Sequence, residues 1–190
     1  ETVIGFNRAL VRQGLKIMAK RQRIGLTALT DVAKMNNAPT PYHLGYLLGP
    51  RINAGGRVGK ADLGIRLLTC KDYNEANSIA EKLNQLNDER RNIESMVQFQ
   101  ALEQVEKRGT NNTLVWAAGE GWHPGVVGIV ASRIKEITNK PTVIIGLDED
   151  VGKGSGRSVS GIDLGSSIAS LQRENLITKG GGHKMAAGLS

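Results

Sequence analysis

The chain has 190 residues, 39% of them hydrophobic, which suffices for one large or two small folded domains and argues against disorder. Lys and Arg outnumber Asp and Glu by 25 to 18, and the net charge of +7 favours a polyanionic partner such as nucleic acid, although an ordinary solubilising surface would give the same balance. Aromatic residues make up only 4%, which argues against a site that stacks bases on a row of rings, and no apolar run approaches a membrane span.

The single cysteine and the two chain ends indicate the setting of the protein. Cys70 permits no disulfide within the chain and favours a reducing, cytoplasmic compartment. The chain begins with Glu1 rather than Met and ends at Ser190, directly after a glycine-rich motif. We therefore expect it to be part of a larger protein.

The first seventy residues are predicted to be mainly helical. Residues 8–20 place apolar side chains on one face and basic side chains largely off it, and a shorter helix follows Gly25. Two asparagines and two prolines in residues 36–41 predict a loop. Short apolar helices are expected at 42–48 and 62–69.

Residues 49–60 contain four glycines, a proline and three cations, and this composition predicts a loop without regular structure. The stretch is similar to a Walker A loop, but Ala54 replaces the glycine five residues before Gly59 and Ala61 replaces the Ser or Thr that binds magnesium. Nucleoside-triphosphatase activity is excluded on that ground. The segment is then either a ligand-binding loop or a turn between two helices.

A long helix is expected next. Residues 72–75 form a start similar to a capping box, and the helical pattern then runs unbroken to about Lys107. Ile79, Leu83, Leu86, Ile93 and Val97 follow a four-three spacing, with Arg90 between them. This pattern predicts a rigid connector between two domains, and a coiled-coil dimer is the alternative.

From residue 113 the pattern alternates between strands and helices, which predicts an α/β sandwich. Strands are expected at 113–118, 141–147 and 153–159, and helices at 126–137 and from Asp163 onward. The glycines at 180–182 predict a turn that leads into the start of a further helix. The sheet is expected to be incomplete at Ser190.

Two glycine-rich motifs in this half predict a phosphate-binding surface. They are residues 153–158 (KGSGRS) and 180–188 (GGGHKMAAG). Glycine lets a backbone approach a ligand and turn several N–H groups toward it, and Lys153, Arg157, His183 and Lys184 add donors and positive charge. We expect His183 to have a ligand-binding role at a helix N-terminus.

No catalytic group is evident from the residues themselves. His43 is expected to be an ordinary helical side chain, and His123, in a turn after a strand, is either functional or part of the turn geometry. None of the histidines has metal-ligand spacing, and no nucleophile-base arrangement appears. The residues alone therefore predict an anion-binding surface without a catalytic centre.

Four motifs, taken together and in this order, resemble a known family. They are residues 49–57 (GPRINAGGR), 122–133 (WHPGVVGIVASR), 154–158 (GSGRS) and 181–188 (GGHKMAAG). The set resembles the RecJ family of single-stranded-DNA-specific 5′→3′ exonucleases, within the DHH phosphoesterase superfamily, and the resemblance covers essentially the whole chain.

This resemblance implies a fold and a division into domains. Residues 1–72 would be the C-terminal helical part of a DHH domain, 73–108 the connector helix, and 109–190 an incomplete α/β DHH-associated C-terminal domain. The aspartates and histidines that hold Mn²⁺ or Mg²⁺ in such enzymes would precede Glu1, so no metal ligand is expected in this chain. An OB-fold domain would also lie outside it.

The resemblance also implies roles for individual residues. One wall of a cleft would use Arg51, Asn53 and Arg57 to touch the DNA backbone. The facing wall would hold phosphates through Ser155, Arg157 and Ser158. Gly181, Gly182 and His183 would grip the phosphate nearest the scissile bond, where His183 would stabilise developing charge as the one tentative catalytic residue.

The function that this resemblance implies is the substrate-binding portion of a DNA repair and recombination exonuclease. Its partners would be single-stranded DNA and, by family resemblance, a single-strand-binding protein and a helicase. The piece by itself is expected to be inactive. The alternatives are another DHH phosphodiesterase that acts on short oligonucleotides or cyclic dinucleotides, and a non-catalytic nucleic-acid-binding module.

Overall fold

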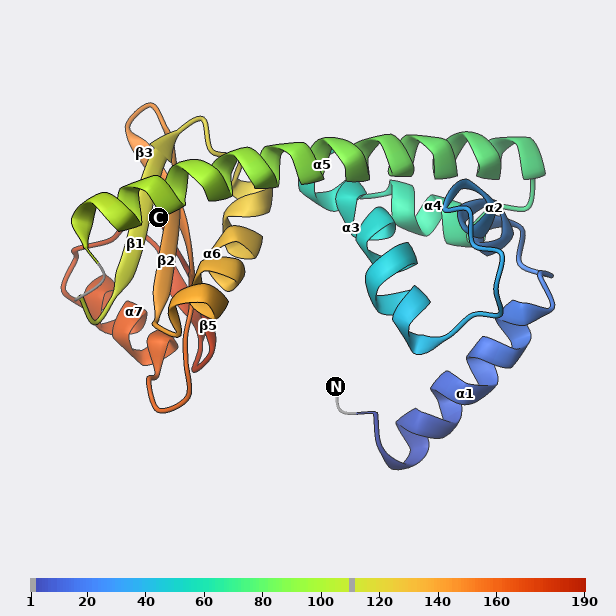
Figure 1. Cartoon of the computed structure of the whole chain (residues 1–190), viewed down its shortest axis with the longest axis horizontal. Coiled ribbons are helices and arrows are strands. Elements are labelled where there is room, and N and C mark those ends of the chain that lie inside the picture. The colour runs from blue at the N-terminus through green and yellow to red at the C-terminus, as the bar shows by residue number, and fades with distance from the viewer. Residues whose placement is uncertain (1–2, 110–111) are drawn as a thin grey trace. The chain divides into compact units, whose positions relative to one another are not determined.

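The computed structural model describes residues 3–109 and 112–190. The chain divides into two compact units, Glu1–Arg90 and Arg91–Ser190, and a single helix, α5 (Tyr73–Arg108), contributes to both (Figure 1). The fold is mixed α/β, as the sequence predicts: the first unit is helical and the second contains a sheet. None of the described helices is long and apolar enough to cross a membrane.

The first unit packs short helices against the N-terminal half of α5, and α1, which has no buried residue, extends from them. Besides α5 it contains α1 (Gly5–Ala19), α2 (Ile24–Val32), η1 (His43–Leu48, a π-helix), α3 (Gly49–Val58) and α4 (Leu63–Thr69). Its core is aliphatic and includes Leu29, Leu48, Leu67 and Leu83, all at most 2% exposed. The predicted start of α5 is confirmed, because the Asp72 carboxylate accepts a hydrogen bond from the Glu75 N–H at 2.7 Å.

The segment at residues 49–60 is a helix over Gly49–Val58, so the prediction of a loop was wrong. Pro50 lies in the first turn of α3, directly after the π-helix η1. Two of the glycines allow close packing against α5: a Cβ on Gly55 would lie 3.1 Å from Leu83 Cδ2, and one on Gly59 would lie 2.6 Å from Leu86 Cδ1. The sequence contains helix breakers here because α3 lies directly against α5.

The apolar seam of α5 is largely buried within the chain. Ile79, Leu83 and Leu86 are at most 6% exposed in the first unit, and Val97 is fully buried in the second. Arg90 is also buried, and its guanidinium donates to the Asn87 carboxamide at 3.1 Å. Most of the predicted seam is therefore occupied by contacts within the chain, while Ile93 is half-buried and Met96 and Phe99 of the same helix are exposed.

The second unit contains a five-stranded sheet in the order β1-β2-β3-β5-β4, with helices α6 and α7 on opposite faces (Figure 1). The elements are β1 (Val115–Glu120), α6 (Pro124–Thr138), β2 (Thr142–Asp148), β3 (Val151–Arg157), α7 (Leu164–Arg173), β4 (Gly180–His183) and β5 (Ala186–Leu189). β1 and β2 run parallel, and all other neighbours are antiparallel. A helix was predicted from Asp163 onward, and the Asp163 carboxylate caps α7 by accepting from the Ser166 N–H at 3.0 Å.

The glycines at 180–182 form strand β4 rather than a turn, and no helix follows them within the described residues, so this prediction was also wrong. β4 and β5 make an antiparallel hairpin in which Gly181 pairs with Gly188 and His183 pairs with Ala186. The hairpin is favoured because it adds two hydrogen-bonded strands to β3. His183 therefore lies at a strand end and not at a helix N-terminus.

The outer edge of β1 is covered by polar side chains of α5. The Gln104 carboxamide donates to the Ala118 carbonyl at 2.7 Å and accepts from the Ala118 N–H at 3.2 Å. One turn later Arg108 donates to the Trp116 carbonyl at 2.6 Å and places its guanidinium 3.6 Å from the centre of the Trp116 ring. These contacts satisfy backbone groups that an edge strand otherwise leaves open.

Candidate nucleic-acid interface

The two glycine-rich motifs of the second unit are brought together by the register of three strands. Across β3, β5 and β4, Arg157 pairs with Ala186 and Ala186 with His183. Two residues along the strands, Ser155 pairs with Gly188 and Gly188 with Gly181. Residues directly opposite each other in antiparallel strands point to the same face. The side chains of Arg157, Ser155 and His183 therefore share a face with the open positions of Gly181 and Gly188.

Helix α7 covers the opposite face. A Cβ on Gly156 would lie 2.5 Å from Leu164 Cδ2, and Ala187 is buried with Leu164 and Ile168. On the face of Arg157, α6 packs over β2 and β3. Beyond it, Gly181, His183 and Gly188 are exposed, so β4 and β5 present a strip of small residues there. We name this strip, together with Ser155 and Arg157, the open strip.

The Arg157 guanidinium is held at the border of the open strip. One of its terminal nitrogens donates to the Ser155 hydroxyl at 2.9 Å and to the Gly156 carbonyl at 2.8 Å. Gly128 of α6 makes room for it, since a Cβ on Gly128 would lie 2.9 Å from Arg157 Nη2 and 3.0 Å from Ser155 Oγ. An oriented guanidinium beside exposed backbone suits a phosphate.

Ser158 does not join this arrangement. Its side chain is 1% exposed, and its hydroxyl donates to the Ile162 carbonyl at 2.8 Å. Its N–H donates to the Met185 carbonyl at 2.9 Å. These bonds tie the turn after β3 to the turn between β4 and β5, so the geometry gives Ser158 a supporting place beneath the surface.

The β4–β5 turn is anchored to the start of α7. The Leu164 N–H donates to the Lys184 carbonyl at 3.1 Å, and a Cβ on Gly165 would lie 2.9 Å from the backbone of His183. The pKa of the Asp163 carboxyl is lowered, first by the hydrogen bond from the Ser166 N–H and further by the positive charge of Lys184. The position of His183 thus depends on how α7 begins.

The three candidate residues of the first unit lie on α3, where they do not all share a face. Asn53 and Arg57 are one turn apart, with Gly56 beside them, and a Cβ on Gly56 would meet nothing within 4 Å. Arg51 projects elsewhere: its Nε donates to the Asn84 carboxamide at 2.9 Å and its Nη1 to the Leu47 carbonyl at 2.7 Å. Arg51 therefore links η1, α3 and α5.

The other two histidines have local roles. His43 bonds to Thr40 within a helix start, and His123 caps α6 by accepting from the Gly125 N–H at 3.0 Å. Among residues 3–109 and 112–190, no group of three or more His, Cys, Asp or Glu side chains could share a metal ion. The described residues therefore do not fit a divalent metal centre.

Sequence reasoning missed the place of Gly128 beside Arg157. A Cβ on this glycine would lie 2.9 Å from Arg157 Nη2, where α6 covers the sheet, and no spacing in the sequence indicates the contact. The anchoring of His183 by Gly165 was missed as well, because it depends on β4 being a strand.

Comparison with known proteins shows which family model, relatives and solved structures the chain resembles. Residues 111–190 match the DHHA1 domain. Over 97% of its length the chain is 37% identical to the single-stranded-DNA-specific exonuclease RecJ of Bacillus subtilis strain 168, of which it spans 24%. The crystal structure of RecJ from Thermus thermophilus in complex with Mg²⁺ superposes with a TM-score of 0.89 at 33% identity, over 100% of this chain and 29% of that one. The structure in complex with Mn²⁺ superposes with a TM-score of 0.87 at 33% identity, over 99% of this chain and 27% of that one. The chain thus spans between about a quarter and a third of the length of the curated relatives that it matches.

Proposed function

Because this chain carries a DHHA1 domain and corresponds along nearly all of its length to a segment of the RecJ exonucleases, we propose that it is the DNA-holding part of such an enzyme. The parent protein would hydrolyse single-stranded DNA from its 5′ end during repair and recombination in the cytoplasm. The boundaries proposed for this part are the helical end of a DHH domain at 1–72, the connector helix at 73–108 and the DHH-associated domain at 109–190.

The register that places Arg157, Ser155, His183, Gly181 and Gly188 on one face carries this proposal. A phosphate on the open strip would accept from the Arg157 guanidinium, which the Ser155 hydroxyl and the space over Gly128 keep in place. The absence of side chains at Gly181 and Gly188 lets the DNA backbone approach the sheet. Phosphate contacts carry no base information, which suits an exonuclease that is indifferent to sequence.

Of the remaining candidate residues, some are proposed to contact the DNA and others to support the residues that do. His183 contacts the phosphate at the far end of the strip and is the one residue proposed to stabilise developing charge. Asn53 and Arg57 hold the DNA backbone from the exposed face of α3, and Arg51 positions that helix through its bonds to Asn84 and Leu47. Gly182 and Ser158 shape the strands beneath.

The metal ion and the partner proteins would be bound by the parent protein. The solved relatives are complexes with Mn²⁺ and Mg²⁺, and we propose that the ligands for such an ion come from outside these 190 residues. A single-strand-binding protein and a helicase are proposed partners of the parent.

The proposal is tested by titrating the 190-residue chain with fluorescein-labelled oligothymidylate of about 15 nucleotides, the upper range for one binding module. Binding should weaken with salt, and no cleavage should occur. Arg157→Ala should lower the affinity several-fold and reduce the salt slope by about 0.7, the value for one phosphate contact to a single strand. Arg173→Ala, on α7 behind the sheet, removes the same charge and should change neither. An equal loss of affinity in the two variants would contradict the role given to Arg157. Cleavage of the DNA by the pure chain would contradict the proposal that this part binds DNA and does not cleave it.

A further inference from the structure

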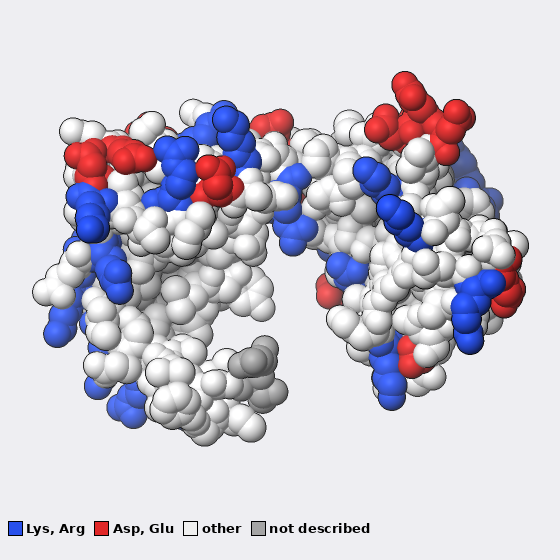
Figure 2. Space-filling model, turned by 180° about the vertical axis from the view of Figure 1, so that it is seen from behind, with Lys and Arg blue, Asp and Glu red and all other residues white. Residues whose placement is uncertain are grey.

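The N-terminal segment of the chain is strongly basic for its length. Between Glu1 and Asp31 the sequence contains no acidic residue and six basic ones. In Figure 2 the part of the first unit at lower left shows blue side chains and no red ones. Charge of one sign gathered on one short segment favours binding of a polyanion there.

Three of these cations form a row along helix α1. Arg8, Arg12 and Lys16 are spaced four residues apart, all are exposed, and they line one shallow surface. Their side chains form no hydrogen bond or ion pair with the part of the chain that the structure describes. Successive members are about 6 Å apart along the axis, at about 1.5 Å per residue, which is close to the spacing of phosphates in an extended strand.

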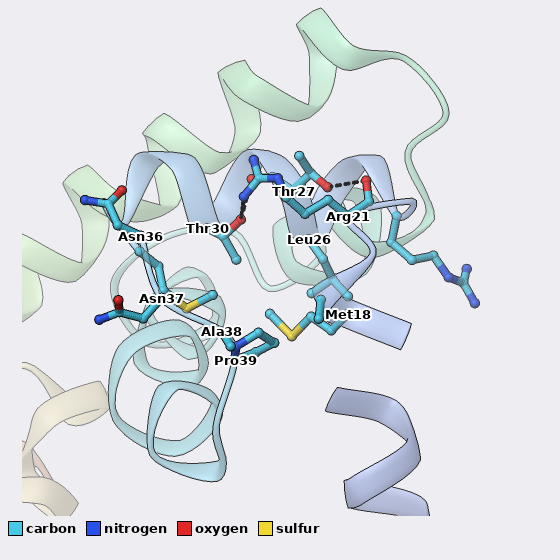
Figure 3. A pocket seen from close by; sticks show the side chains of 12 residues that line it. Met18, Arg21, Leu26, Thr27, Thr30, Asn36, Asn37, Ala38 and Pro39 are labelled. Carbon is cyan, nitrogen blue, oxygen red and sulfur yellow. Dashed lines mark hydrogen bonds between the residues drawn. The ribbon is translucent and has the colours of Figure 1, made fainter. Parts of the chain in front are cut away.

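A pocket lies at the C-terminal end of the same helix. Its volume is about 250 Å³, and it is enclosed by the end of α1, by α2 and by the loop at 35–39. Figure 3 shows Met18 and Leu26 on the side of Ala38 and Pro39, with Asn36 and Asn37 at the other end. The pocket therefore joins an apolar floor to an amide rim.

Arginine side chains border this pocket. The Arg21 guanidinium donates to the Thr30 hydroxyl at 3.3 Å and pairs with Asp31, and the Arg21 carbonyl accepts from the Thr27 hydroxyl at 3.0 Å (Figure 3). These bonds fix the turn between α1 and α2. Arg23 lies in the same lining. A planar, partly polar group of modest size beside an anion suits such a space.

We propose that α1 and this pocket form a second contact surface for single-stranded nucleic acid, with phosphates along Arg8, Arg12 and Lys16 and one unstacked base in the pocket. The identity of the polymer rests on the function proposed above, whereas the surface lies in the first unit and is separate from the open strip. The thioether of Met18 and the ring of Pro39 contact the base face. The amides of Asn36 and Asn37 supply donors and acceptors to its edge.

The basic row is tested with the same labelled oligothymidylate and the 190-residue chain. The triple variant Arg8→Gln, Arg12→Gln, Lys16→Gln should reduce the salt slope by about 2, since each of three phosphate contacts contributes about 0.7. The control is Lys71→Gln, Lys82→Gln, Lys107→Gln, which removes three exposed charges elsewhere. Circular dichroism shows whether both variants remain folded. Equal salt slopes for the two triple variants would contradict the proposal that Arg8, Arg12 and Lys16 bind phosphates.

The pocket is tested by narrowing it. Ala38 is exposed in the loop, so Ala38→Leu should leave the melting temperature unchanged while filling part of the pocket. It should weaken binding of the base-bearing strand several-fold and leave binding of an abasic strand of equal length unchanged. An equal effect on both strands, or no effect on either, would overturn base binding and leave the pocket to another occupant such as a peptide.

The two proposals fail separately. Loss of binding in Arg157→Ala but not in the Arg8, Arg12, Lys16 triple would overturn only the second surface. Loss in the triple but not in Arg157→Ala would overturn the open strip as the DNA-holding surface.

Discussion

Gly128 and Arg157 meet between α6 and the sheet: a Cβ on the glycine would lie 2.9 Å from Nη2 of the arginine. The helix that covers β2 and β3 therefore leaves space for one side chain, and that side chain borders the open strip. The relationship makes packing of α6 a determinant of how the guanidinium points. A change at Gly128 should therefore affect DNA binding more than the stability of the fold, because the guanidinium of Arg157 can move without moving the backbone.

We expect Gly128→Ala to weaken binding of single-stranded DNA several-fold while the free energy of unfolding changes by less than about 1 kcal/mol, the usual difference between Gly and Ala in a helix. The added methyl displaces the guanidinium rather than the strand. DNA titration and urea denaturation measure the two quantities. Gly45→Ala in η1, where a Cβ meets nothing within 4 Å, is the control and should leave binding unchanged. Wild-type affinity in Gly128→Ala would contradict the role given to this contact.

Adjacent glycines of β4 should respond in opposite ways to alanine. A Cβ on Gly181 meets nothing within 4 Å, so Gly181→Ala should alter stability by less than about 0.5 kcal/mol but obstruct the approach of DNA to the open strip. A Cβ on Gly182 would lie 2.3 Å from the Ala186 carbonyl oxygen, so Gly182→Ala should cost about 1–3 kcal/mol. Denaturation and DNA titration of both variants check this. If Gly181→Ala binds as well as the wild type, the strip does not hold the DNA backbone.

The bonds from Gln104 to Ala118 should contribute measurably to stability. Gln104→Ala removes two hydrogen bonds to the edge of β1, and we expect a loss of about 1–3 kcal/mol in the free energy of unfolding. Gln85→Ala, at an exposed position of the same helix, should cost little. Urea denaturation measures both, and a similar loss in the two variants would mean that helix propensity rather than edge coverage is responsible.

The lowered pKa of Asp163 predicts a pH dependence. The folded state prefers the ionised carboxylate, so its stabilising effect is fully present above the unfolded pKa of about 3.9 and is lost as pH falls through the lower folded value. Asp163→Asn should therefore be less stable than the wild type at pH 7, and the difference should shrink toward about pH 3. Denaturation at both pH values tests this, with Asp150→Asn in the exposed turn as the control. A difference that is independent of pH would exclude the charge as its cause.

The local sequence pattern was sufficient to predict the helices whose stabilising contacts are near in sequence. The four-three spacing of α5 and the caps at Asp72 and Asp163 predicted helices that the structure contains, since an apolar face and a capping carboxylate act within one or two turns. The motif residues Arg157 and His183 were also identified from the sequence as phosphate-binding candidates. That assignment stays a prediction.

Long-range packing decided what the glycines do. Gly55 and Gly59 appear as helix breakers in the sequence, but they belong to a helix and its end because α5 comes too close for side chains there. Gly180–His183 appears as a turn, but it is a strand because β5 offers it a hydrogen-bonding partner.

The sequence by itself determined the α/β class, the long helix and the chemical character of the anion-binding motifs, because each depends on composition or on neighbours along the chain. Only the tertiary structure decided that Arg157 and His183 share one face and that Ser158 lies beneath it. Strand register sets which side of a sheet a residue occupies, and register depends on partners that are distant in sequence.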